Sequence, residues 1–148
     1  MPSWAVYQSI LVGDFFYLVF IDGLELKPMY EYLATVNRVI DGDTIEVSVD
    51  LGFSLVWTTP VRLYGINAAE TNSGVAAERS AAMAAKNFLT SSVMGKEVRV
   101  KTVKPKDKYG RYLAEVWKTD GLQPKSVNQT MVDMKLVKQW DGQGEKPV

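Results

Sequence analysis

The sequence predicts a mainly β domain with helices, an α+β fold, and three observations support this class. Five segments have the pattern of strands, one Ala-rich segment favours a helix, and an apolar stripe at helical spacing follows near the C-terminus. A chain of 148 residues has the length of one domain with room for an appendage.

The first two strands are predicted at Tyr30–Ile40 and Asp43–Asp50. The second alternates between apolar and polar residues, as expected for a strand with one buried face. Between them lies the acidic turn Asp41-Gly42-Asp43, where glycine accepts a positive φ and Asp41 can bond its own backbone. Taken alone, this turn is most simply a solvated loop.

A third strand region is predicted at Phe53–Ile66, with Pro60 marking a bulge or an edge within it. Alternation places Arg62 on the face opposite to Val61 and Leu63. The chain then leaves the sheet as a loop that carries an acidic residue, Glu70.

A helix is predicted at Gly74–Ser92, because the segment is rich in alanine. Its apolar residues form a stripe at helical spacing, which we interpret as the face that packs on the core. The stripe consists of Ala77, Ala81, Ala84, Ala85, Phe88 and Leu89.

Two more strands are predicted at Lys96–Thr102 and Arg111–Lys118. Ser126 then resembles an N-cap, with Gln129 as its capping-box partner, at the start of a helix that runs to about Trp140. Five strands, with one helix between the third and fourth and another at the C-terminus, fit the OB-fold, a small Greek-key barrel.

Residues 1–28 form an apolar N-terminal extension of uncertain role, ahead of a predicted domain at 29–148. The extension lacks a basic start and a clear cleavage site, so it does not resemble a signal peptide. Its uncharged runs are too short to span a bilayer. We expect it to pack on the domain; alternatively, translation begins at Met29. The missing signal peptide favours a cytoplasmic location over secretion.

Composition limits the possible chemistry. The chain has no Cys and no His, which excludes thiol nucleophiles, disulfides and imidazole bases. Any metal site would use oxygen ligands, which suit Ca²⁺ or Mg²⁺. The formal net charge is zero, but seven basic and two acidic residues lie between Lys96 and Arg111. This local excess can meet phosphates or simply form a solvated face.

Four charged residues together suit the cleavage of a phosphodiester. Asp43 could bind a cation, and Glu70 could take a proton from water. Arg62 and Arg111 offer planar forks that match phosphate oxygens. Singly, Arg62 could equally form a salt bridge on the barrel surface, and Glu70 could be an acid that precedes a helix.

Three segments resemble the signature blocks of the staphylococcal nuclease (thermonuclease) family. They are Ile40-Asp41-Gly42-Asp43-Thr44, the block from Arg62 to Thr71 (RLYGINAAET), and Asp107-Lys108-Tyr109-Gly110-Arg111. The resemblance covers about residues 30–140. It implies a Ca²⁺-dependent nuclease that hydrolyses DNA and RNA and leaves 3′-phosphate ends.

The resemblance also implies a role for each matching residue. Glu70 matches the general base, while Arg62 and Arg111 match the arginines that hold the scissile phosphate. The carboxylate of Asp43, the side chain of Asn67 and the backbone carbonyl of Ala68 match the metal ligands. Matches to supporting groups beside the metal are Asp41 and Thr44, and matches to substrate contacts are Lys108 and Tyr109.

Two residues depart from the family pattern. Asn67 stands where the family usually has a second carboxylate, so we expect weaker Ca²⁺ binding. Ala69 replaces the proline that usually precedes the glutamate, which loosens the loop that carries Glu70.

Two other functions compete with the nuclease. One is a catalytically weak or inactive OB-fold domain that only binds nucleic acid. The other is a protein-interaction domain that docks through its aromatic N-terminus. The presence of both acids and both arginines favours the enzyme. We expect DNA, RNA or both as partners, a monomeric state, and no membrane association.

Overall fold

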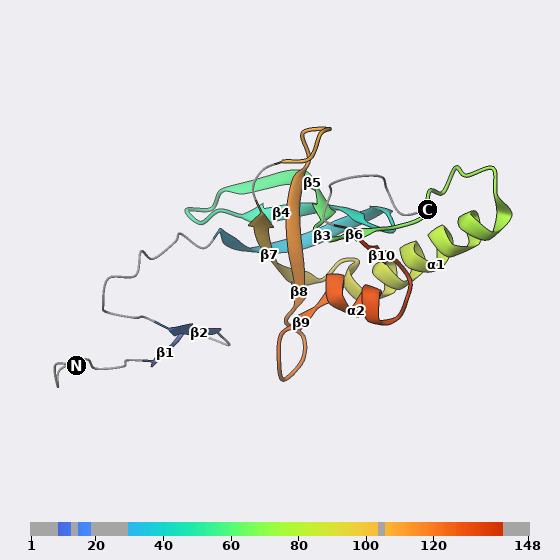
Figure 1. Ribbon diagram of the computed structural model, residues 1–148. Helices are drawn as coiled ribbons and strands as arrows, with labels where there is room; N and C mark the ends of the chain where they lie inside the picture. The colour runs from blue at the N-terminus through green and yellow to red at the C-terminus, as the bar shows by residue number, and fades with distance from the viewer. Residues whose placement is uncertain (1–8, 13–14, 19–29, 104–105, 141–148) are drawn as a thin grey trace.

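The described part of the chain forms a small β-barrel flanked by helices (Figure 1). A computed structural model describes residues 9–12, 15–18, 30–103 and 106–140. The barrel strands are β3 (Glu31–Asp41), β4 (Thr44–Asp50), β5 (Val56–Leu63), β7 (Glu97–Val103) and β8 (Tyr112–Lys118). They follow the order β5-β4-β3-β7-β8, and a parallel pairing of β5 with β8 closes the barrel. This confirms the predicted five-stranded OB-fold barrel.

Aliphatic side chains from alternate positions of the strands fill the barrel. The most deeply buried are Val36, Ile45, Val47, Leu63, Val98, Val100 and Val116. The alternation in the sequence is therefore the direct cause of the closed sheet, because it gives each strand one apolar face to bury.

Four short strands pair outside the barrel's main ladder, and a fifth extends it. In the described part of the extension, β1 (Ser9–Val12) and β2 (Phe15–Leu18) form an antiparallel sheet of their own. Most of residues 1–28 lies outside the described residues, so their packing on the domain stays a prediction. β6 (Ile66–Asn67) pairs with β10 (Lys138–Gln139), and β9 (Lys125–Ser126) extends β8.

The third strand region is shorter than predicted. β5 begins at Val56, because Phe53 and Ser54 adopt positive φ values of 51° and 60° in a turn. Pro60 pairs in regular register with Glu46, so it marks no bulge. Pro60 pairs with β4 alone, and the pairing of β5 with β8 begins at the next residue, Val61. The strand is therefore an edge at Pro60, as predicted.

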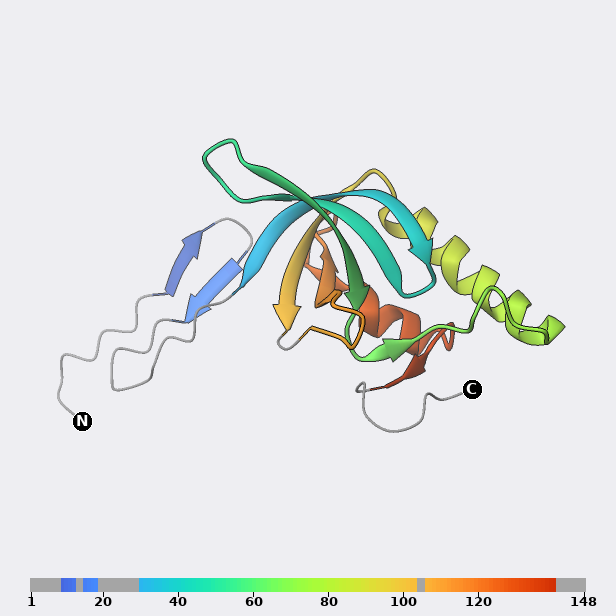
Figure 2. The same ribbon diagram turned by 90° about the horizontal axis from the view of Figure 1, so that it is seen from above.

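The first helix, α1 (Ala76–Val93), confirms the predicted helix but not its whole buried stripe. Ala82, Ala85, Leu89 and Val93 are buried, whereas Ala77, Ala81 and Ala84 are exposed. Figure 2 shows the reason: the N-terminal half of α1 projects beyond the barrel, so no sheet covers it.

The second helix, α2 (Val127–Asp133), is half as long as predicted. Ser126 caps it by accepting a hydrogen bond from the Gln129 N–H at 3.2 Å, but the Gln129 side chain donates to Asp133 instead of returning to the cap. Lys135 has a φ of 57°, which ends the helix and allows β10 to form. Neither helix of the described residues is long and apolar enough to cross a membrane.

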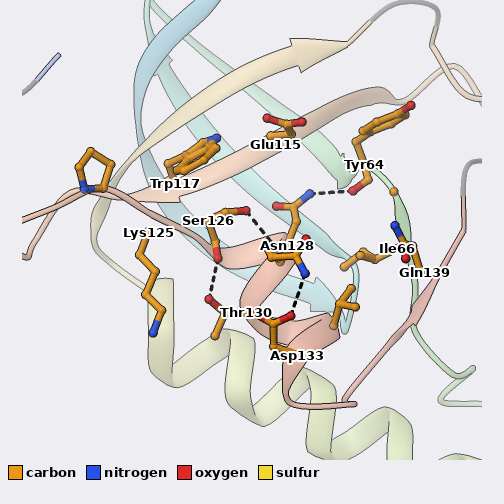
Figure 3. A pocket seen from close by; sticks show the side chains of 14 residues that line it. Tyr64, Ile66, Glu115, Trp117, Lys125, Ser126, Asn128, Thr130, Asp133 and Gln139 are labelled. Carbon is orange, nitrogen blue, oxygen red and sulfur yellow. Dashed lines mark hydrogen bonds between the residues drawn. The ribbon is translucent and has the colours of Figure 1, made fainter. Parts of the chain in front are cut away.

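Asn128, at the start of α2, joins two parts of the barrel (Figure 3). Its side-chain oxygen accepts from the Val116 N–H at 3.0 Å, and its amide donates to the carbonyl oxygens of Tyr64 and Ala114 at 2.8 and 3.2 Å. This buried side chain therefore holds the end of β5 against β8. The sequence analysis assigned it no role.

Candidate active site

The acidic turn between β3 and β4 is held against α1. A Cβ atom on Gly42 would lie 2.8 Å from the Cβ of Ala85 and 2.9 Å from the Cβ of Ala68. Such contacts are shorter than van der Waals distances, so only glycine allows this approach. The turn and the segment after β6 are thereby brought together.

The carboxylate of Asp43 is surrounded by donors. Its Oδ1 accepts from the Thr44 hydroxyl at 2.9 Å, and its Oδ2 accepts from the Ala68 N–H at 3.0 Å. The Arg62 Nη2 lies 3.3 Å from the same Oδ2. The exposed fractions of the two side chains are 13% for Asp43 and 7% for Arg62, so this is a buried ion pair rather than a surface salt bridge.

Arg62 also links Asp43 to Asn67. Its Nη2 donates to the Asn67 Oδ1 at 3.2 Å, and its Nη1 donates to the Leu63 carbonyl at 3.2 Å. The two side chains expected to bind a metal therefore converge on one cationic nitrogen. Asp41 lies beside them, paired with Thr44 across the turn.

Two acceptors of this cluster, the Asp43 carboxylate and the Asn67 side-chain oxygen, are of types that suit Ca²⁺. They carry one formal negative charge. No group of three or more acidic, His or Cys side chains that could hold a metal occurs among the described residues. These oxygens suit a cation in type, but in this structure both accept from the Arg62 guanidinium.

Trp140 covers Arg62, a contact that the sequence analysis missed. The Cζ of Arg62 lies 5.5 Å from the centre of the indole ring, a cation–π distance. Trp140 is held in this position because its backbone N–H donates to the Gly65 carbonyl at 2.9 Å, next to the pairing of β10 with β6. The sequence placed Trp140 in a helix, so this contact was not foreseeable from the helical pattern.

Arg111 belongs to a tight loop organised by Asp107. The Asp107 carboxylate accepts from the N–H groups of Tyr109 and Arg111, both at 2.9 Å, and from the Arg111 Nε at 2.7 Å. Burial alone would raise the pKa of Asp107, but these hydrogen bonds and the charge of Arg111 hold that pKa below its ordinary value. An aspartate before a Tyr-Gly pair was the available signal for such a turn.

Two cations of this loop lie close to the exposed Tyr109 ring. The Lys108 Nζ lies 5.0 Å and the Arg111 Cζ 5.2 Å from its centre. Tyr109 is 66% exposed, so it is open to solvent and not packed on the rim of the sheet.

The register of the barrel relates the two arginines. In the parallel pair of β5 and β8, Arg62 is opposite Leu113, and Arg111 comes two positions before Leu113. Side chains two positions apart in an extended chain share a face. Arg111 lies in the loop directly before β8, and Arg62 lies on the neighbouring strand β5. Of the two arginines, Arg62 is the one that contacts Asp43.

Glu70 lies on the loop that leaves β6, two residues after Ala68. The residue is exposed, and its carbonyl accepts from the Ser73 N–H at 3.3 Å. The structure therefore places Glu70 on the chain segment that also carries Asn67 and Ala68.

Fold and site together define a class: a closed OB-fold barrel with a buried Asp–Arg cluster beside a basic, tyrosine-bearing loop. Residues 60–141 match the family model described as staphylococcal nuclease homologue. The chain belongs to this family. The matched residues include Arg62, Glu70 and Arg111, while Asp43 lies before them and is joined to them by its contact with Arg62.

A named relative supports the same assignment. The chain is 40% identical over 86 residues to a protein named thermonuclease from Staphylococcus intermedius. The similarity covers 57% of this chain and 48% of that protein, so the chain spans about half of the length of the curated relative it matches.

Proposed function

We propose that the chain is a Ca²⁺-dependent nuclease that hydrolyses phosphodiester bonds of DNA and RNA and leaves 3′-phosphate ends. The observation that carries this proposal is the convergence of Asp43 and Asn67 on Arg62, with Arg111 in the loop directly before the adjacent strand β8. The family membership and the named thermonuclease support it.

The two arginines would bind the scissile phosphate. Their planar guanidinium groups match phosphate oxygens, and charge accumulates on these oxygens as phosphorus becomes five-coordinate. Arg62 starts paired with Asp43, whereas Arg111 is partly exposed and held at its Nε by Asp107, which leaves its other donors for substrate. Lys108 and Tyr109 would contact the neighbouring phosphate and nucleotide.

Glu70 would act as the general base. It is an exposed carboxylate on the same segment as the proposed metal ligands, so it can meet both water and substrate. Transfer of a proton from the attacking water to Glu70 would generate the nucleophile, and the leaving 5′-oxygen would take up a proton from the solvent.

Ca²⁺ would be held by the Asp43 carboxylate, the Asn67 side-chain oxygen and the Ala68 carbonyl. Asp41 would add negative charge nearby, and the Thr44 hydroxyl would orient the Asp43 carboxylate. When bound, the ion would supply positive charge to the phosphate oxygens and acidify water.

A second candidate function is nucleic-acid binding without efficient cleavage. The single negative charge of the Asp43–Asn67 donor set favours it, because the charge of the Arg62 side chain already neutralises that set. On this alternative, Arg62 and Arg111 hold phosphates but no ion is retained.

The test is cleavage of plasmid and single-stranded substrates with Ca²⁺, with Mg²⁺ and with a chelator. We expect Ca²⁺-dependent cleavage that falls by about 10²–10³ in both Glu70→Gln and Arg111→Ala. Arg38→Ala is the matched control, because Arg38 forms only an exposed salt bridge with Glu46. Absence of cleavage at high Ca²⁺, with salt-sensitive binding retained, would favour the second candidate.

A further inference from the structure

A second concave site lies at the mouth of the barrel, where β3, β5 and β8 begin and β4 and β7 end. Its volume is about 500 Å³. Core residues Val49, Val61 and Val100 form its floor. The sequence pattern did not predict this cavity, and the residues proposed for catalysis do not line it.

Aromatic side chains line the walls of this mouth. Trp57 and Tyr112 meet edge to face, with ring centres 5.1 Å apart and planes at 82°. Tyr30 and Trp57 remain 39% and 43% exposed, and Tyr32 also faces the cavity. Rings held in place by one another but open to solvent are suited to stacking a flat, apolar ligand surface.

The charge at the mouth favours an anionic ligand. Among the described residues that line it, Lys106 is the single charged one, and its Nζ lies 4.0 Å from the centre of the Tyr112 ring. A ligand that fits the mouth therefore has a flat apolar part, which contacts the aromatic rings, and a negative charge close to Lys106.

The mouth adjoins the arginines of the proposed active site. Tyr112 directly follows Arg111, Val61 directly precedes Arg62, and Tyr112 and Val61 are paired across β5 and β8. Because successive side chains alternate in direction, the pocket and the two arginines lie on opposite sides of the same pair of strands. Arg111 and Tyr112 are consecutive residues, so the proposed phosphate site and the mouth share this stretch of backbone.

We propose that the barrel mouth binds an unpaired nucleobase of a single-stranded nucleic acid, stacked on the Trp57 ring and in contact with Tyr112, whose ring is nearly perpendicular to it. This inference rests on the proposed function for the position of the phosphates. It adds a base-binding subsite that distinguishes single strands from duplexes, since bases within a duplex are already stacked and cannot enter.

The test is equilibrium binding of a single-stranded oligonucleotide in the presence of a chelator. We expect Trp57→Ala and Tyr112→Ala each to weaken binding about tenfold, the size of effect seen for loss of one stacking side chain. Trp57→Phe should restore most of the affinity. Phe53→Ala is the matched control, because this ring is 99% exposed on the turn between β4 and β5 and does not line the mouth.

Two further substrates make the test specific. Binding of a duplex should be the same for all variants, which also shows that they remain folded. Binding of a strand with abasic positions should be weaker in the wild type and should not fall further in Trp57→Ala. An equal loss on abasic and normal strands would overturn the proposal.

Equal affinity of the wild type and both alanine variants for the normal strand would also overturn it. The chelator prevents cleavage, so the assay measures binding alone. A protein without nuclease activity can therefore still show the expected loss of binding in the alanine variants. A protein that cleaves normally but shows no dependence on Trp57 would contradict this inference alone and leave the proposed function intact.

Discussion

Two regions of the candidate site each use an aspartate to hold an arginine, but they are built differently. Asp43 and Arg62 are 19 residues apart in sequence, and the partners of Asp43 include the Ala68 N–H, 25 residues away. Asp107 and Arg111 are four residues apart, within one loop. The first arrangement therefore exists only when the barrel is closed, whereas the second is a local structure.

Because of this difference, substitutions in the Asp43–Arg62 region should lower both stability and activity. Substitutions in the Asp107–Arg111 region should lower activity with little loss of stability. The Asp43–Arg62 pair lies nearly out of contact with water, where an unpaired charge is costly. The Asp107–Arg111 pair is more accessible, with the Arg111 side chain 30% exposed, so solvent can replace its contacts.

The largest expected contrast is between Arg62→Ala and Arg111→Ala. Both should lower cleavage by about 10²–10³, because each removes a donor to the phosphate. Arg62→Ala should also lower the free energy of unfolding by about 3 kcal/mol, since it leaves the Asp43 carboxylate buried without its cation. Arg111→Ala should lower it by less than about 1 kcal/mol. Urea unfolding at neutral pH measures both; equal losses of stability would remove the distinction between the two regions.

The close contact of Gly42 with α1 gives the next largest effect. Gly42→Ala should destabilise the protein by about 1–3 kcal/mol, because its Cβ would overlap Ala85 and Ala68. It should also reduce cleavage, since Ala68 donates to Asp43. The control is Gly74→Ala, where a Cβ meets no atom within 4 Å and φ is not in the left-handed region. A Gly42→Ala protein as stable as this control would contradict the proposed packing of the turn.

A third change sharpens the electrostatic side of the comparison. Asn67→Asp should lower the Ca²⁺ dissociation constant about tenfold or more, because two unit charges about 4 Å apart interact by ~4 kcal/mol at an effective dielectric of 20 before desolvation, and Ca²⁺ carries two. Isothermal titration with Ca²⁺ measures this independently of cleavage. Asn37→Asp on β3 is the control, because Asn37 bonds Ser48 outside the cluster. Unchanged affinity in Asn67→Asp would exclude position 67 as a ligand.

The sequence was sufficient to predict the elements whose signals are local. The alternation in β4, the Asp-Gly-Asp turn and the alanine content of α1 each depend on residues within one segment. Their arrangement in an OB-fold barrel followed from the order of these segments. The proximity of Asp43 to Arg62 came from the family resemblance rather than from any local pattern, because it depends on how two distant strands pair.

The residues that were missed depend on contacts between distant segments. Asn128 looked like an ordinary first-turn helix residue, but its side chain binds backbone groups of β8 and of Tyr64. Trp140 continued an apolar helical stripe, but the pairing of β10 with β6 outweighed that preference and brought it over Arg62. In α1 the pattern correctly indicated a helix, yet the burial of its first half depended on where the barrel ends. Helical periodicity reports an apolar face and does not report what covers it.

The smallest expected effect tests the local region. Asp107→Asn keeps the shape of the side chain but removes its charge, so we expect a loss of about 1 kcal/mol of stability at neutral pH. The pKa of Asp107 is lower in the folded protein than in the unfolded chain. Its contribution is therefore complete above the ordinary carboxyl pKa of ~3.9 and disappears as the pH falls through the lower folded value.

The difference in stability between the wild type and Asp107→Asn should accordingly be constant around neutral pH and shrink towards zero as the pH falls below the ordinary carboxyl pKa of ~3.9. Urea unfolding across this range measures it, with Asp133→Asn, an exposed carboxyl on α2, as the control. The cleavage rate at neutral pH should fall by more than the loss of stability alone explains, because the Arg111 guanidinium is no longer held in the position that binds the phosphate. A difference in stability that grows as the pH falls would contradict the role of the charged Asp107 in holding this loop.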